Sequence, residues 1–148
     1  MDEPLIPFIK EDRKFLTKRG DPNNNIYHFD GFLQGRNSIT NIGGYTVFKN
    51  GKLLAHEFRG REERPFTNNE AELLGCLHAC QVAEPGSELI TDSMNTVAWA
   101  RRGRSKARPD LNDIMYECNK LIREKSLDLY WLPRDENLAG QYNEFGEA

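Results

Sequence analysis

Three acidic residues stand at the ends of predicted strands and helices, where a sheet could bring them together. Asp30 interrupts an apolar strand, Glu72 lies in the first turns of a long helix, and Asp92 ends a short strand. If the first and fourth strands are parallel neighbours, Asp30 and Asp92 become adjacent, and a helix crossing that face adds Glu72. Three carboxylates held so close repel one another, and a divalent cation keeps them ionised. Because the set contains no His or Cys, Mg²⁺ or Mn²⁺ is favoured over zinc.

Each acid taken singly has a plainer interpretation, as a solvent-facing carboxylate or a helix cap. Asp92 precedes Ser93 and could cap the helix that follows. Asp30 is the hardest to explain in this way, because an acid between Phe29 and Phe32 needs a partner. The sequence therefore predicts a metal site around Asp30.

Hydrophobic patterning predicts the elements that would carry these acids. Asn50-Gly51 is a strong hairpin signal, and Thr67 with Glu70 forms a capping box at the start of a long helix. The expected strands are residues 26–30, 43–48, 52–58, 88–91 and 127–132. The expected helices run from Thr67 to Val82, from Ser93 to about Arg102 and from Pro109 to Ile122, followed by a weakly helical tail from Asp135.

The resulting order is β-β-β-α-β-α-α-β-α, with hairpins first and alternating strands and helices afterwards. This order predicts an α/β fold with a mixed sheet, antiparallel at one side and parallel at the other. Residues 1–25, which contain three prolines and three consecutive asparagines, are expected to form a partly flexible N-terminal leader. Residues 26–148 are expected to form one domain.

Length and composition exclude several classes of protein. A chain of 148 residues with 38% hydrophobic and 29% charged residues is an ordinary globular domain, not collagen, a coiled coil or a disordered chain. No apolar stretch approaches the roughly 20 residues that span a bilayer, and the acidic start lacks the order of a secretory signal. We expect a monomeric protein of the cytoplasm without a membrane partner.

The charge is unevenly placed along the chain. Residues 101–108 contain five basic residues and no acid, which leaves 15 basic against 23 acidic residues elsewhere. A solvated loop is one interpretation, and contact with a phosphate backbone is the other. The sequence alone favours neither.

Three cysteines are too few, and odd in number, for a disulfide framework. A metal site from Cys76, His78 and Cys80 is conceivable, but side chains at this spacing point around a helix and do not converge. The favoured interpretation is that Cys76, Cys80 and Cys118 are small buried apolar side chains in a reducing compartment.

Several local motifs together resemble a known family. They are Phe29-Asp30-Gly31, Ile42-Gly43-Gly44-Tyr45, Thr67-Asn68-Asn69-Glu70-Ala71-Glu72-Leu73, Thr91-Asp92-Ser93 and Leu132-Pro133-Arg134-Asp135-Glu136-Asn137-Leu138-Ala139. On these motifs the chain resembles type 1 ribonuclease H from about Ile26 to Asn143. The resemblance implies a ribonuclease H-like fold, with a five-stranded mixed sheet and helices on both faces. It also implies hydrolysis of the RNA strand of RNA–DNA hybrids by an endonuclease that uses two Mg²⁺ ions, with Mn²⁺ as an alternative.

The resemblance assigns roles to individual positions. Asp30, Glu72 and Asp92 match the first three catalytic, metal-binding carboxylates. Asn68 and Asn69 match a turn that touches the backbone and minor groove of the hybrid. Gly31 matches a position where the protein backbone approaches the RNA, and a side chain there would hold the 2′-hydroxyl away.

The substrate contacts expected beyond this turn are basic. Arg102 and Arg104 belong to the basic segment, and Arg134 lies in the last matched motif. All three are expected to bind the substrate.

The family's fourth carboxylate is replaced here by Gly140. If the tail is helical, Glu144 lies one turn further along the same face and is a possible substitute ligand for the metal. Two alternatives to the ribonuclease therefore stay open. One is a nucleic-acid-binding module whose catalysis has decayed, and the other is a DNA nuclease or resolvase of the same fold.

Overall fold

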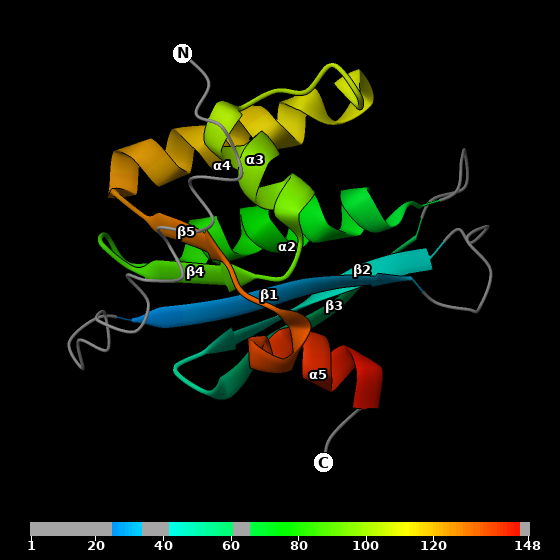
Figure 1. The fold of residues 1–148 in the computed structure, drawn as a ribbon, viewed down its shortest axis with the longest axis vertical. Coiled ribbons are helices and arrows are strands. Elements are labelled where there is room, and N and C mark those ends of the chain that lie inside the picture. The colour runs from blue at the N-terminus through cyan, green and yellow to red at the C-terminus, as the bar shows by residue number, and fades with distance from the viewer. Residues whose placement is uncertain (1–24, 34–41, 61–65, 146–148) are drawn as a thin grey trace.

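A five-stranded mixed sheet forms the centre of the molecule (Figure 1). The computed structural model describes residues 25–33, 42–60 and 66–145, so the expected leader lies almost wholly outside the described residues. The strands are β1 (Ile26–Leu33), β2 (Ile42–Lys49), β3 (Lys52–Gly60), β4 (Glu88–Thr91) and β5 (Asp128–Trp131). Their order across the sheet is β3-β2-β1-β4-β5. The pairs β1–β2 and β2–β3 are antiparallel, whereas β1–β4 and β4–β5 are parallel, so the predicted mixed sheet is confirmed.

Helices cover both faces of the sheet, as expected. The helices are α2 (Asn68–Val82), α3 (Met94–Arg102), α4 (Asn112–Lys125) and α5 (Leu138–Phe145). The first three lie on one face, where α2 packs on β1 and β2 and α4 packs on α2 and α3 (Figure 1). The short α5 packs on β1 and β2 from the opposite face.

The turn and cap signals in the sequence are largely confirmed. Asn50 and Gly51 adopt φ angles of 50° and 83°, the left-handed values that a tight hairpin between β2 and β3 requires. Thr67 accepts a hydrogen bond from the backbone N–H of Glu70 and begins α2. The expected start of the third helix is wrong by one turn, because Pro109–Leu111 forms a 3₁₀ turn and α4 begins at Asn112. The fixed φ of proline suits both kinds of turn, so the residue marks the start but not the type.

The main core lies between the sheet and α2 to α4. Tyr27 and Phe29 alternate along β1 toward this side and are fully buried. They pack with Val47 of β2, Leu89 of β4 and Cys76 of α2. Because α2 lies on this core across β1, the first turns of the helix are fixed over the middle of the sheet. Among the described residues, no helix is both long and apolar enough to cross a membrane.

Candidate metal centre

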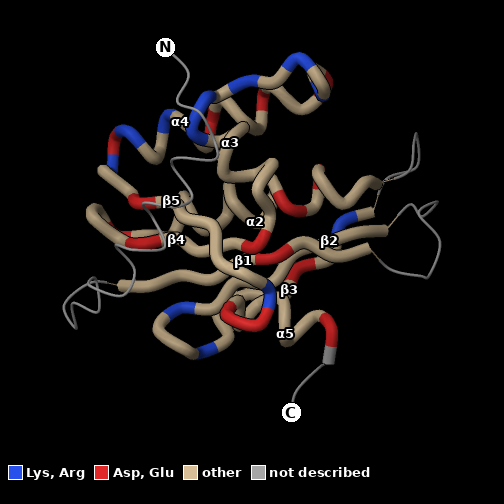
Figure 2. The backbone as a smooth tube through the Cα atoms, viewed as in Figure 1, with Lys and Arg blue, Asp and Glu red and all other residues tan. Residues whose placement is uncertain are grey.

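Asp30, Glu72 and Asp92 converge at the middle of the sheet. Each offers a carboxylate oxygen, and the three oxygens lie within 4.8 Å of one another. Parallel β1 and β4 pair up to His28 and Ile90, and Asp30 and Asp92 each lie two residues beyond this last pair, so the two acids are close neighbours. Figure 2 shows acidic positions of neighbouring segments meeting at this place under α2. The predicted convergence of the three acids is therefore found in the structure.

Glu72 reaches the cluster because α2 packs directly on the backbone of β1. The N–H of Gly31 donates a hydrogen bond to Oε1 of Glu72. A Cβ atom at position 31 would lie 2.4 Å from the backbone nitrogen of Glu72 and 2.5 Å from the carbonyl carbon of Ala71. Glycine is thus required at position 31 for the close approach of the helix. The packing of α2 thus gives a reason for glycine at this position that differs from the one expected from the sequence, and the expected contact of Gly31 with the RNA stays a prediction.

Hydrogen bonds to the backbone fix the position of Asp92, so that its carboxylate is free to join the cluster. Ser93 is the N-cap of α3, and its Oγ accepts from the N–H of Thr96 at 3.2 Å. The interpretation of Asp92 as a cap is therefore wrong. The indole N–H of Trp131 donates to the carbonyl oxygen of Asp92 at 3.1 Å and fixes the strand end.

Asn143 contacts the cluster and was missed by the sequence reasoning. Its side-chain amide nitrogen lies 3.0 Å from Oδ2 of Asp30, and its Oδ1 accepts a hydrogen bond from the hydroxyl of Thr46. Asn137 anchors α5 at this point, because its amide nitrogen donates to the carbonyl of Phe29 at 3.0 Å and its oxygen accepts from the N–H of Ala139 at 3.1 Å. One signal in the sequence could have found it. Asn143 lies three residues after Gly140, which puts the two on one face of a helix.

Burial and mutual repulsion perturb the acids. Burial raises the pKa of Asp30 to about 6, and the charge of Asp92 adds to this, while the hydrogen bond from Asn143 opposes it. Burial raises the pKa of Glu72 well above its ordinary range, and the neighbouring charge of Asp30 acts in the same direction. Without a cation, at neutral pH, the site thus holds negative charge at a cost in free energy.

Arg134 supplies the positive charge nearest to the cluster among the described residues. Its Nε lies 3.0 Å from Oδ2 of Asp92, and one of its terminal nitrogens lies 3.9 Å from Oδ1 of Asp30. The other terminal nitrogen lies 3.6 Å from a carboxylate oxygen of Glu144. The side chain of Glu144 is 45% exposed, and its described ion pair is with Arg134 and not with an acid of the cluster. Its proposed role as a metal ligand stays a prediction.

Gly140 lies directly against the acids. A Cβ atom there would be 3.2 Å from Oδ2 of Asp92, so a carboxylate at this position would join the cluster. The position therefore has the geometry of a fourth ligand but lacks the chemical group.

The three acids fit a hard divalent cation. Oδ1 of Asp30 is buried and accepts no hydrogen bond from the part of the chain that the structure describes. A buried carboxylate oxygen of this kind is stabilised by a positive charge. The donors are all oxygen, which suits Mg²⁺ or Mn²⁺ and not a soft ion.

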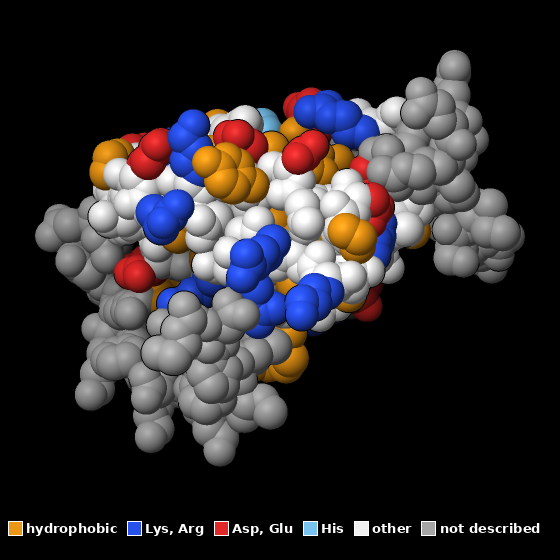
Figure 3. Space-filling view, turned by 90° about the horizontal axis from the view of Figure 1, so that it is seen from above, with side chains coloured by type: hydrophobic (Ala, Val, Ile, Leu, Met, Phe, Trp, Pro, Cys, Tyr) orange, Lys and Arg blue, Asp and Glu red, His pale blue; other side chains and the backbone are white. Residues whose placement is uncertain are grey.

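The expected substrate residues lie at the start of α2 and at the end of α3. Asn68 and Asn69 form the first turn of α2, where free backbone N–H groups favour anions. Arg102 and Arg104 are exposed at the C-terminal end of α3 and line a surface pocket of about 870 Å³ with Lys106. Lys and Arg side chains are prominent on the helical side of the molecule (Figure 3).

Arg108, the last basic residue of this segment, has a different environment. Its guanidinium forms two hydrogen bonds with Asp110, at 3.0 and 2.9 Å, and a third with the hydroxyl of Thr67 at 3.0 Å. Arg108 therefore ties the basic loop to the start of α2. The five basic residues of the segment are not equivalent.

No protein-family model matches the sequence. The structure is similar to the N-terminal RNase H domain of a Mycobacterium tuberculosis protein, with 23% identity, coverage of 83% of this chain and 93% of that chain, and a TM-score of 0.59. RNase H1 from Halobacterium salinarum matches at 20% identity, with 79% and 91% coverage and a TM-score of 0.59. An RNase H1 isolated from compost matches at 21% identity, with 82% and 94% coverage and a TM-score of 0.63. The same compost protein in complex with an RNA/DNA hybrid matches at 19% identity, with 78% and 89% coverage and a TM-score of 0.55. These likenesses establish that the chain has the ribonuclease H fold.

Proposed function

We propose that the protein is a metal-dependent endoribonuclease that hydrolyses the RNA strand of RNA–DNA hybrids. The observation that carries this proposal is the convergence of Asp30, Glu72 and Asp92 within 4.8 Å in a ribonuclease H fold. One protein of this fold has been solved in complex with an RNA/DNA hybrid, which supports the choice of substrate. Carboxylate clusters of this kind suit phosphodiester hydrolysis, in which charge develops on oxygen atoms.

The three carboxylates would hold two divalent ions, Mg²⁺ or Mn²⁺. When bound, such ions lower the pKa of a water and offset the charge that develops on the leaving oxygen. Asn143 orients Asp30 by holding Oδ2, which leaves Oδ1 for a cation. Arg134, whose side chain is 52% exposed, can turn from Asp92 toward a phosphate of the substrate.

The remaining contacts would position the hybrid. Asn68 and Asn69 present amide groups at the start of α2, close to Glu72 on the same helix. Arg102 is the last residue of α3 and Arg104 follows it, roughly 14 Å along this nine-residue helix from its start next to Asp92. Contacts at the start of α2 and at the end of α3 would position a duplex at more than one phosphate.

A monomer in a reducing, cytoplasmic compartment completes the proposal. All three cysteines are free and buried, which is consistent with such a compartment.

The experiment is a cleavage assay with three labelled duplexes: RNA–DNA hybrid, double-stranded RNA and double-stranded DNA. Each is incubated with the protein in Mg²⁺, in Mn²⁺ or in EDTA. Cleavage of the hybrid alone, dependent on the metal and lost in Glu72→Gln, supports the proposal. Cleavage of double-stranded DNA would identify a DNA nuclease or resolvase. Activity that survives in EDTA would contradict a metal-dependent enzyme.

A second candidate function is supported by Gly140. The cluster has three carboxylates where the family pattern supplies four, and Arg134 already balances part of their charge. A protein with such a site could bind hybrids without cleaving them. Tight binding to the hybrid with no cleavage in either metal would support this binding module.

A further inference from the structure

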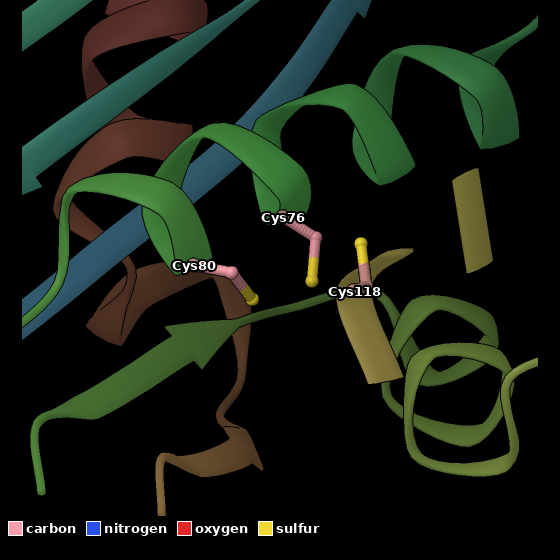
Figure 4. Close-up of side chains that lie close together, drawn as sticks. All are labelled: Cys76, Cys80 and Cys118. Carbon is pink, nitrogen blue, oxygen red and sulfur yellow. The ribbon is translucent and has the colours of Figure 1, made fainter. Parts of the chain in front are cut away.

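The three cysteines form a second cluster, away from the acids. Cys76 and Cys80 lie one turn apart on α2, and Cys118 faces them from α4 (Figure 4). Their sulfur atoms lie within 4.8 Å of one another, and all three side chains are fully buried. Cys118 is 38 residues from Cys80 in the chain, so the packing of α4 on α2 creates the cluster.

The cluster differs from the site that the sequence suggested. His78 takes no part, because its Nδ1 is hydrogen-bonded to the hydroxyl of Tyr45 at 3.0 Å on another side of α2. His78 diverges from the two cysteines as expected. The expectation that all three side chains point apart is nevertheless wrong, because Cys76 and Cys80 lie four residues apart on one face of α2 and their sulfurs converge. The expected burial of the cysteines is also confirmed, but in a group and not singly.

We propose that Cys76, Cys80 and Cys118 form a binding site for a soft ion of coordination number three that is held by sulfur alone. Three atoms no more than 4.8 Å apart lie at most about 2.8 Å from a common centre. Bonds between thiolate sulfur and a metal are about 2.3 Å long. Small side-chain adjustments would therefore bring all three sulfurs to bonding distance.

The number and type of donors select the ion. Sulfur donors favour soft ions, and the described part of the chain gives this cluster no carboxylate or histidine ligand. Structural zinc sites have four protein ligands, so a site with three donors in a dry core does not suit Zn²⁺. Cu⁺ and trivalent arsenic both accept three sulfur ligands.

The two ions differ in the charge that they leave in the core. Arsenous acid, As(OH)₃, reacts with three thiols so that three As–S bonds form, three As–O bonds break and three waters leave. The product is neutral, and no atom changes its oxidation state. Cu⁺ displaces three thiol protons and leaves two net negative charges, of which Lys125 can offset one. The ammonium of Lys125 donates to the backbone carbonyl of Cys80 at 2.8 Å.

A bound ion would join α2 to α4. Cys76 lies one turn after Glu72 on α2, so the ion would stabilise the helix that carries an acid of the metal centre. The site itself does not depend on nuclease activity.

The test uses the full-length protein, reduced and free of oxygen. Cu⁺, supplied as its acetonitrile complex, is titrated against a chromophoric Cu⁺ chelator, and arsenite is titrated separately with detection by mass spectrometry. Zn²⁺ is the third arm. We expect one equivalent of Cu⁺ or of arsenite to bind, at least tenfold more tightly than Zn²⁺, and the arm that binds identifies the ion. Failure of both probes, or equal affinity for Zn²⁺, would overturn the proposal.

Two variants on α4 separate the site from general packing. Cys118→Ala removes one sulfur and should lower the affinity for the ion at least 100-fold. Met115→Leu replaces a buried sulfur-containing residue outside the cluster and should leave that affinity unchanged. Unchanged affinity in Cys118→Ala contradicts the proposal. If this variant does not fold, X-ray absorption on the unmodified protein decides. A first coordination shell of three sulfur atoms around the bound ion supports the proposed site, and any other set of ligand atoms contradicts it.

Discussion

The side-chain amide of Asn143 donates a hydrogen bond to Oδ2 of Asp30 over 3.0 Å, although 113 residues separate them in the chain. The same amide accepts from the hydroxyl of Thr46, the residue paired with Asp30 across β1 and β2. One oxygen of Asp30 is thereby fixed, and the other is left without a hydrogen bond from the described residues. In Asp30, one carboxylate oxygen therefore binds Asn143, and the other is available to bind a cation.

Asn143→Ala removes the hydrogen bond that lowers the pKa of Asp30, so that pKa should rise above about 6. A smaller fraction of Asp30 is then ionised in weakly acidic solution, and Mg²⁺ binding should weaken more at pH 6 than at pH 8. Mg²⁺ affinity, measured by calorimetry across this range, checks the prediction. Gln141→Ala, on the same helix but bonded to the backbone of Asp135, is the control. Parallel losses at both pH values would contradict the proposed orienting role.

Asp30→Asn should abolish cleavage and, in EDTA, stabilise the protein. The pKa of Asp30 is raised to about 6 in the folded state, from an ordinary value near 3.8. A raised carboxyl pKa favours folding below the unfolded value, and this contribution is lost as the pH rises through the folded value. The variant should therefore be more stable at pH 7.5, by on the order of 2–3 kcal/mol, and the difference should fall to about 0.5 kcal/mol at pH 4.

Urea unfolding of both proteins in EDTA, at pH 7.5 and pH 4, measures this difference. Added Mg²⁺ should stabilise the unmodified protein and leave Asp30→Asn nearly unchanged. Retained cleavage in the variant, or a stability difference that is independent of pH, would argue against Asp30 as the centre of the metal site.

The sequence could predict the acids because their positions depend on the order of the strands. Asp30 lies within the apolar strand β1 and Asp92 directly follows β4, and the parallel pairing of these two strands makes the acids neighbours. That pairing follows from the pattern of hairpins and alternating helices. The same pattern places α2 over β1, and Glu72 with it.

Individual contacts between side chains that are far apart in the sequence could not be predicted in this way. The hydrogen bond from Asn143 depends on how α5 crosses the sheet, which Asn137 fixes through the backbone of Phe29. The bonds of Arg108 to Asp110 and Thr67 depend on the path of one loop. No periodicity in the sequence encodes either arrangement. The meeting of Cys118 with α2 likewise requires the angle between two helices.

Neutralising Arg102 or Arg104 should weaken hybrid binding and its dependence on salt. Each phosphate interaction that the substitution removes should reduce the slope of log affinity against log salt by roughly 0.7–0.9. Arg108→Gln should instead lower the stability of the protein, because Arg108 joins the loop to the start of α2. Binding titrations at several salt concentrations, together with thermal unfolding, distinguish the two effects. An unchanged slope for Arg102→Gln and Arg104→Gln would mean that the loop is merely solvated.

Glu144→Gln tests whether Glu144 replaces the missing ligand. Its side chain is 45% exposed and its carboxylate contacts Arg134, so the structure predicts less than a tenfold loss of cleavage. The measurement is the initial rate of hybrid cleavage at several Mg²⁺ concentrations. A loss of 100-fold or more that high Mg²⁺ restores would identify Glu144 as a ligand.

Gly140→Asp should convert the cluster of three carboxylates into one of four. The Cβ atom of residue 140 would lie 3.2 Å from Oδ2 of Asp92, so the new carboxylate adds repulsion when no metal is present. The variant should be less stable in EDTA than the unmodified protein, gain more stability from Mg²⁺, and cleave the hybrid faster in Mg²⁺.

Gly140→Asn is the matched control, since it has nearly the same size without the charge and should show none of these gains. Thermal unfolding with and without Mg²⁺ measures the first two effects, and the cleavage rate measures the third. If Gly140→Asp binds Mg²⁺ no better than Gly140→Asn, then position 140 does not face the metal site. The missing fourth carboxylate would then not explain a low rate of cleavage.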